Sequence, residues 1–225
     1  MPYAGAVMDF KAGTLAVIFD LDGVIADSEP LHQLGFRRLF EELGLDPGPT
    51  DDWHRFVGTS DRSVLIRLLN GRDVGRSLDD LLDRKAALFL DLLKEREPLF
   101  PEIPELVPAL AARYPLAVAS GSLRTAIAGV LALRDLRRHF QFTVSVQDVA
   151  HGKPAPDLFL RAAELLKVAP QACVVLEDSV AGVTAARAAG MRVIGITNTT
   201  SKELLEAARA DAVVGHYDPV RQLLI

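Results

Sequence analysis

The chain is poor in several features that would place it in a special class of protein. It has one cysteine, Cys173, so no disulfide can form within the chain, and a reducing compartment is expected. No apolar run approaches the roughly 18 residues that a membrane-spanning helix requires. The N-terminus lacks the basic stretch followed by a long apolar stretch that is typical of a secretion signal. We therefore expect a cytoplasmic protein without membrane contact.

Basic residues are also scarce relative to acidic ones. Lysine and arginine total 25 against 30 aspartates and glutamates, which gives a net charge of −5. This balance argues against general binding to nucleic acids or anionic membranes. Hydrophobic residues make up 49% of the 225 positions, so the chain is expected to fold around a substantial core.

Short apolar runs in the sequence indicate buried strands. Their near-continuous apolar character, without alternation, is typical of strands covered on both faces in a parallel sheet. Helical patterns separate the runs from about residue 100 onward. The sequence thus predicts an α/β fold with a doubly wound, mostly parallel, Rossmann-like sheet. The candidate strands are residues 15–20, 116–120, 141–146, 172–177, 192–197 and, more weakly, 212–214.

The segment 29–97 interrupts this alternation, because only helical patterns occur there. The first of three expected helices begins near Glu29, with Pro30 well placed in its first turn. We therefore predict a Rossmann-like core formed by residues 1–28 and 98–225, with an inserted all-helical cap domain between them.

Polar side chains follow the predicted strands at their carboxyl ends, where ligands bind in open α/β sheets. Four carboxylates at one edge would repel one another strongly unless a cation neutralised them. Oxygen ligands without a cysteine or histidine cluster favour Mg²⁺ over zinc. The sequence therefore predicts a magnesium site here. The polar residues at this edge are Asp20, Asp22, Ser120, Gly121, Ser122, Lys153, Glu177 and Asp178.

This set of groups suits phosphoryl transfer. A carboxylate beside Mg²⁺ can attack phosphorus and form an aspartyl-phosphate. A second carboxylate two residues later points to the same side of an extended chain. It can protonate the leaving alkoxide and then deprotonate the attacking water. A lysine neutralises charge on the transferring group, while a serine hydroxyl and backbone N–H groups hold its oxygens.

Four segments of the chain resemble, in order, the four motifs of the haloacid dehalogenase-like (HAD) hydrolase superfamily. They are 20-DLDGV-24, 118-VASGS-122, 152-GKPAPD-157 and 176-LEDSVAG-182. The resemblance covers essentially the whole chain, including a helical cap inserted after the first motif. The dehalogenases of the family lack the second aspartate of the first motif, so the presence of Asp22 sets dehalogenation aside.

The resemblance implies a role for each matching residue. Asp20 would be the nucleophile and Asp22 the acid/base, while Ser120 and Lys153 would hold the phosphate. Mg²⁺ would be bound by Asp20, the backbone carbonyl of Asp22 and two further carboxylates. Those two carboxylates are Glu177 and Asp178.

Within the superfamily, 24-VIADSEPLH-32 looks like the group that contains β-phosphoglucomutase and small sugar-phosphate phosphatases. The resemblance implies that His32 links cap closure to the acid/base. The cap stretch 57-VGTSDRS-63 resembles the substrate-specificity loop of this group. The mutase has arginine where this chain has Asp61, with Arg62 one place later, and a basic residue where it has Leu123. Both departures favour a phosphatase.

Each candidate residue also has a purely structural interpretation. Ser120 and Ser122 suit helix caps. The acidic pair of the fourth motif suits the start of the following helix. Lys153, His32 and Arg62 suit solvated surface positions.

Three functions stay open at this level. The first is a Mg²⁺-dependent phosphatase that hydrolyses a small phosphomonoester, a sugar phosphate or related metabolite, through an aspartyl-phosphate. The second is an isomerase of the β-phosphoglucomutase kind, and the third is a non-catalytic binding protein of the same fold. We favour the phosphatase, with Arg62, His32, Gly121 and Ser122 as substrate contacts. A monomer or weak homodimer is expected.

Overall fold

A six-stranded parallel sheet forms the centre of the computed structural model, which describes residues 9–46, 53, 55–56 and 59–225. Its strand order is β3-β2-β1-β4-β5-β6. The chain first moves outward from β1 to β3 and then returns to the other side of β1, so the predicted doubly wound sheet is confirmed. The strands are β1 (Ala16–Phe19), β2 (Leu116–Ala119), β3 (Phe142–Val144), β4 (Cys173–Glu177), β5 (Arg192–Ile196) and β6 (Ala212–Val214).

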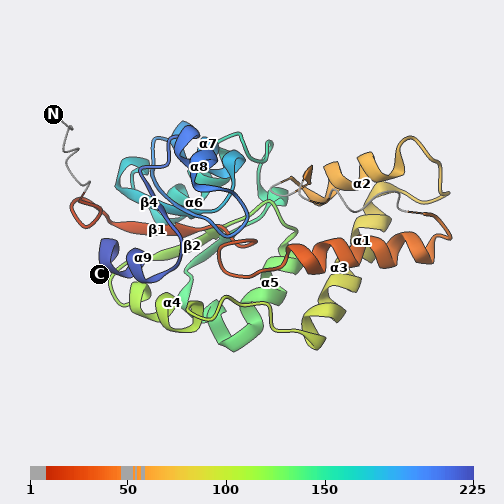
Figure 1. Cartoon of the computed structure of the whole chain (residues 1–225), viewed down its shortest axis with the longest axis horizontal. Helices are drawn as coiled ribbons and strands as arrows, with labels where there is room; N and C mark the ends of the chain where they lie inside the picture. Colours follow the sequence, from red (N-terminus) through yellow and green to blue (C-terminus); the bar gives the residue numbers. More distant parts are fainter. Residues whose placement is uncertain (1–8, 47–52, 54, 57–58) are drawn as a thin grey trace.

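Helices cover both faces of this sheet (Figure 1). Along β1, Val17 and Phe19 pack into one apolar cluster, while Ala16 and Ile18 pack into the other. This alternation explains the unbroken apolar run, because each face of the strand is buried against helices. One face is covered by α4 (Ile103–Ala111), α5 (Arg124–Ala132) and α9 (Asp218–Leu224). The other is covered by α6 (Asp157–Leu166), α7 (Val180–Ala188) and α8 (Lys202–Ala207).

Three helices lie beside the sheet and pack on one another: α1 (Glu29–Glu42), α2 (Asp61–Leu69) and α3 (Leu78–Glu95). They share an apolar cluster that is separate from the two clusters of the sheet. Serine side chains cap two of them: Ser60 accepts from the Ser63 backbone at the start of α2, and Ser77 forms a capping box with Asp80 in α3. The helical character of the insertion thus agrees with the sequence, while its boundaries as a domain stay a prediction.

Contacts between these helices and the sheet side of the molecule come from both directions. The last turns of α3 contribute Phe89 and Leu92 to the cluster that covers the sheet. In return, Leu123, which follows the second motif, packs against the apolar cluster of α1–α3. Leu123 therefore contacts the helical insertion at the position where the mutase carries a basic residue.

Two further expectations concern Cys173 and membranes. Cys173 is fully buried in β4, and burial raises the pKa of its thiol to about 11. It is therefore a core residue, as the apolar run around it indicates. Among the described residues, no helix combines the length and apolar character needed to cross a membrane.

Candidate active site

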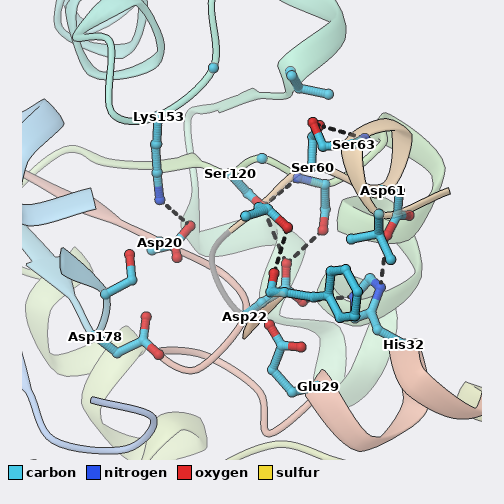
Figure 2. A pocket seen from close by; sticks show the side chains of 18 of the residues that line it. Asp20, Asp22, Glu29, His32, Ser60, Asp61, Ser63, Ser120, Lys153 and Asp178 are labelled. Atoms are coloured by element: carbon cyan, nitrogen blue, oxygen red, sulfur yellow. Dashed lines mark hydrogen bonds and ion pairs between the residues drawn. The ribbon is translucent and has the colours of Figure 1, made fainter. Parts of the chain in front are cut away.

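The carboxyl ends of β1, β2 and β4 meet at a cavity of about 270 Å³. Strand register accounts for this convergence, because Phe19 of β1 pairs with Val118 of β2 and with Leu176 of β4. Asp20 and Glu177 therefore leave adjacent strands at nearly the same level. The predicted residues that line the cavity are Asp20, Asp22, His32, Ser120, Gly121, Ser122, Lys153 and Asp178 (Figure 2).

Three buried carboxylates form an acidic cluster on one side of this cavity. Asp20, Glu177 and Asp178 each place one oxygen within 4.8 Å of the others. Lys153 Nζ lies 2.7 Å from Asp20 Oδ1 and also forms an ion pair with Glu177. The lysine does not point along a hydrogen-bond direction of Asp20 Oδ1, which lacks an aligned donor among the described residues. One lysine thus faces three acids.

The pKa values of this cluster reflect that imbalance. Burial raises the pKa of Asp20 to about 8, with the charges of Glu177 and Asp22 adding to the effect and Lys153 opposing it. Burial and the neighbouring Glu177 and Asp20 also raise the pKa of Asp178 well above its usual range. A divalent cation among these oxygens would remove the repulsion, and an oxygen-only ligand set is the one that Mg²⁺ prefers. The cluster is therefore suited to Mg²⁺.

Two glycines permit this close approach of carboxylates to the backbone. Gly23 has a φ of +81°, and a Cβ there would lie 1.9 Å from Asp178 Oδ2. A Cβ at Gly182 would lie 1.7 Å from Glu177 Oε1. Both positions exclude any larger residue unless a carboxylate moves, which is the physical reason for glycine in the first and fourth motifs.

Glu177 is fixed more firmly than its neighbours in the cluster. Its Oε2 accepts hydrogen bonds from the backbone N–H groups of Asp178 and Ser179, both at 2.9 Å, and from the Ser179 hydroxyl at 3.0 Å. Asp178 has fewer donors, with Thr199 Oγ1 donating to its Oδ2. Sequence reasoning missed Thr199, which lies after β5 without a motif to mark it.

Asp22 lies apart from this cluster and is surrounded by donors. Ser122 Oγ donates to Asp22 Oδ2 at 2.6 Å and Ser120 Oγ lies 3.4 Å from the same oxygen, while Ser28 Oγ donates to Oδ1. His32 Nε2 lies 3.2 Å from Oδ1. Although burial opposes ionisation, His32 and the serine hydroxyls hold the pKa of Asp22 well below its usual range. Asp22 is therefore a carboxylate at neutral pH.

His32 in turn lies between two carboxylates. Asp22 Oδ1 faces its Nε2 at 3.2 Å, and Asp61 Oδ1 faces its Nδ1 at 3.4 Å. Although burial and the charge of Lys85 oppose protonation, these two carboxylates raise the pKa of His32 to about 9. His32 is thus buried in the site and protonated at neutral pH, and it is no solvated surface residue.

Behind His32, the structure reveals two residues that sequence reasoning did not place at the site. Lys85 of α3 is 1% exposed, and its Nζ lies 2.7 Å from Asp61 Oδ2 at the start of α2. Opposite charges therefore alternate from Asp22 through His32 and Asp61 to Lys85. A signal existed in the sequence only for Lys85, as a lysine on the otherwise apolar face of α3.

Arg62 does not lie at the main cavity. It pairs with Asp79 on the exposed surface and lines a separate cavity between the helical insertion and the sheet. Arg67 lines the main cavity instead. Ser60, Ser63, Val64 and Arg67 all line it, and their spacing of i, i+3, i+4 and i+7 is that of one helix face. The specificity stretch begins at residues 57–58, which lie outside the described residues.

Known proteins share this sequence and this geometry. The model of the haloacid dehalogenase-like hydrolase family matches residues 17–196. A phosphorylated carbohydrates phosphatase of Thermotoga maritima is 37% identical over 199 residues, which cover 85% of this chain and 90% of that protein. The β-phosphoglucomutase of Bacillus subtilis is 34% identical over 190 residues, with coverages of 80% and 82%. The crystal structure of CbbY from Rhodobacter sphaeroides in complex with phosphate superimposes with a TM-score of 0.81 at 29% identity, covering 91% of this chain and 95% of that chain. The chain therefore belongs to the haloacid dehalogenase-like hydrolase family.

Proposed function

We propose that the protein is a Mg²⁺-dependent phosphatase that hydrolyses small phosphomonoesters, such as sugar phosphates, through an aspartyl-phosphate on Asp20. The observation that carries the proposal is the contrast between the two aspartates of the first motif. Asp20 lies in an acidic cluster beside Lys153 with Oδ1 lacking an aligned donor, whereas Asp22 is held among hydroxyls and His32. One carboxylate suits a nucleophile and the other suits proton transfer.

Each residue of the cavity has a defined task in this proposal. Asp20 Oδ1 attacks the phosphorus, and Lys153 neutralises the charge of the transferring group. The hydroxyl of Ser120 and the backbone N–H groups near Gly121 bind its oxygens. Asp22 exchanges the proton with the leaving oxygen and then takes a proton from the attacking water, with protonated His32 as its hydrogen-bonded partner.

Mg²⁺, held by Asp20, Asp178 and the backbone carbonyl of Asp22 with Glu177 behind them, supplies further neutralisation of the phosphate charge. Asp178 and Glu177 belong to the same buried cluster as Asp20. Glu177 also positions Lys153, with which it forms an ion pair.

The surroundings of Asp61 favour hydrolysis over isomerisation. An isomerase of the β-phosphoglucomutase kind must bind a second phosphate while the first reacts. At the position of the mutase arginine, this chain has Asp61, which is engaged by Lys85 and His32. Arg62 is paired with Asp79 away from the cavity. One observation supports the isomerase as the second candidate, which is that Arg67 lines the cavity from α2.

A coupled assay decides between the two reactions. The protein is incubated with Mg²⁺ and a panel of sugar and polyol phosphates, and phosphate release is measured. β-Glucose 1-phosphate is included with a coupled assay for glucose 6-phosphate. Steady phosphate release without an isomer supports the phosphatase, whereas formation of glucose 6-phosphate that a sugar bisphosphate stimulates supports the isomerase.

The Asp20→Asn variant tests the nucleophile in the same assay. We expect it to lose phosphate release by at least about 10³-fold while it keeps the thermal midpoint of a folded protein. Full turnover by this variant would show that Asp20 is not the nucleophile. Absence of turnover by the unaltered protein on the whole panel would instead favour a non-catalytic binding protein.

A further inference from the structure

Glu29 is an acidic residue of the cavity that the proposed mechanism does not use. It is the first residue of α1, and its side chain lines the cavity (Figure 2). Trp53 Nε1 donates to Glu29 Oε2 at 2.9 Å. Among the described residues, this is the one hydrogen bond that the Glu29 side chain accepts, which leaves Oε1 as an acceptor toward the cavity.

No basic residue within the described part of the chain forms an ion pair with Glu29. Burial raises the pKa of its carboxyl, with the charge of Asp22 adding to the effect and that of His32 opposing it. Placing a carboxyl group in a partly dehydrated wall costs free energy unless its oxygens accept hydrogen bonds. A donor from a bound molecule would satisfy the oxygen that Trp53 leaves open.

Aromatic rings hold the other side of this wall. Trp53 packs against Phe36 with ring centroids 5.8 Å apart and against Phe56 at 5.4 Å. Trp53 and Phe56 also line the cavity. Rigid aromatic surface beside one buried acceptor is the composition of a site for a small molecule that is partly apolar and carries hydroxyl groups.

The order of groups along the cavity relates Glu29 to the reaction. A phosphate at Asp20 and Lys153 places the ester oxygen near Asp22, which exchanges its proton. Figure 2 shows the Glu29 carboxylate on the far side of Asp22 from Lys153, near enough to Asp22 for their charges to interact. The carbon skeleton of the substrate therefore extends from Asp22 toward Glu29.

We propose that Glu29 is a specificity-determining residue that accepts a hydrogen bond from a substrate hydroxyl close to the phosphorylated carbon, so that the substrates are phosphate monoesters of polyols or sugars. This inference rests on the proposed phosphatase function. It also excludes a class of substrates, because a carboxylate at this position repels a phosphate ester whose neighbouring group is itself a carboxylate, such as phosphoglycolate. Glu29 thus selects hydroxyl groups over anions.

Matched pairs of substrates test this role in the Glu29→Gln variant. Glutamine keeps an oxygen that can accept from Trp53 but removes the charge. On glucitol 6-phosphate and glycerol 3-phosphate we expect kcat/KM to fall about 10- to 100-fold, the range for loss of a hydrogen bond to a charged group. On hexyl phosphate and propyl phosphate, which lack the hydroxyls, we expect a change below about threefold. Phosphoglycolate should be hydrolysed no more slowly than by the unaltered protein.

Asp27→Asn is the matched control, since it makes the same carboxylate-to-amide change at an exposed position outside the cavity. It should alter none of these rates. Equal losses on hydroxylated and alkyl substrates in Glu29→Gln, or an unchanged rate on the hydroxylated pair, would overturn the proposal.

Binding measurements separate this proposal from the proposed function. If the unaltered protein hydrolyses none of these esters, calorimetry on the Asp20→Asn variant compares the affinity for glucitol 6-phosphate with that for hexyl phosphate. A preference for the hydroxylated ester that Glu29→Gln removes supports the role of Glu29 even where hydrolysis fails. Equal affinities with and without this substitution would refute it.

Discussion

Lys85 Nζ lies 2.7 and 2.8 Å from the two carboxylate oxygens of Asp61, although the lysine side chain is 1% exposed. The rings of Phe36 and Phe89 flank the ammonium group, with centroids 4.8 and 5.2 Å from it. Asp61 in turn faces His32, which faces Asp22. All three helices of the insertion are therefore connected to the acid/base aspartate through alternating charges.

Removing one member of this buried pair should be costly. For Lys85→Met we expect a loss of about 3–5 kcal/mol in the free energy of unfolding, because Asp61 is left without its partner. The double variant Asp61→Leu with Lys85→Met should lose less than the sum of the two single variants. Urea denaturation measures all three. The exposed pair Arg62 and Asp79 is the control, and Arg62→Ala should cost less than about 1 kcal/mol. A similar small loss in Lys85→Met would contradict the importance of the pair.

Arg67, and not Arg62, should affect the use of substrates with a second anionic group. Arg67→Gln is expected to lower kcat/KM for a sugar bisphosphate about tenfold or more, because it removes a cation from the cavity wall. Arg62→Gln should stay within about twofold, since its side chain pairs with Asp79 outside that cavity. Steady-state kinetics on one bisphosphate and one monophosphate check both variants. The reverse order of effects would support the role that the sequence predicts for Arg62.

Gly23→Ala should impair metal binding specifically. The added methyl group would meet Asp178 Oδ2 at 1.9 Å, so the carboxylate must move away from Asp20. We expect Mg²⁺ affinity to fall at least about tenfold, as for disturbed support of metal ligands. Gly75→Ala is the control, because Gly75 also has a positive φ, of +66°, but no atom lies within 4 Å of its added Cβ. It should cost about 1 kcal/mol of stability and leave Mg²⁺ affinity unchanged. Equal affinities of the two variants in calorimetry would contradict the contact.

Mg²⁺ binding should strengthen as the pH rises from 6 to 8. Burial raises the pKa of Asp20 to about 8, so the metal-free protein holds a proton on this carboxyl over most of that range. Because a ligand carboxylate must be deprotonated, binding releases the proton. The apparent affinity should therefore rise by up to about tenfold per pH unit below 8 and level off above it. Calorimetry in two buffers with different ionisation enthalpies counts the released protons. An affinity independent of pH in this range would show that Asp20 is already ionised.

Local patterns account for the parts of the molecule that could be predicted. Apolar runs of five or six residues located the strands within one or two residues, because strands buried on both faces have no polar positions. Parallel strands then bring their carboxyl ends to one edge, which is why residues as distant as Asp20 and Glu177 could be assigned to one site. The helix that contains Arg62 was also expected, but its rotation about its own axis was not.

The sequence by itself determined the doubly wound sheet and the set of acids, serines and lysine at its edge, because periodicity and strand order specify backbone placement. The tertiary structure decided which side chains meet across the cavity. Only the packing of α1, α2 and α3 pairs Lys85 with Asp61, directs Arg67 into the cavity and turns Arg62 toward Asp79. Such contacts depend on the rotation and distance of helices that are far apart along the chain, and these quantities are set by the joint packing of their apolar faces.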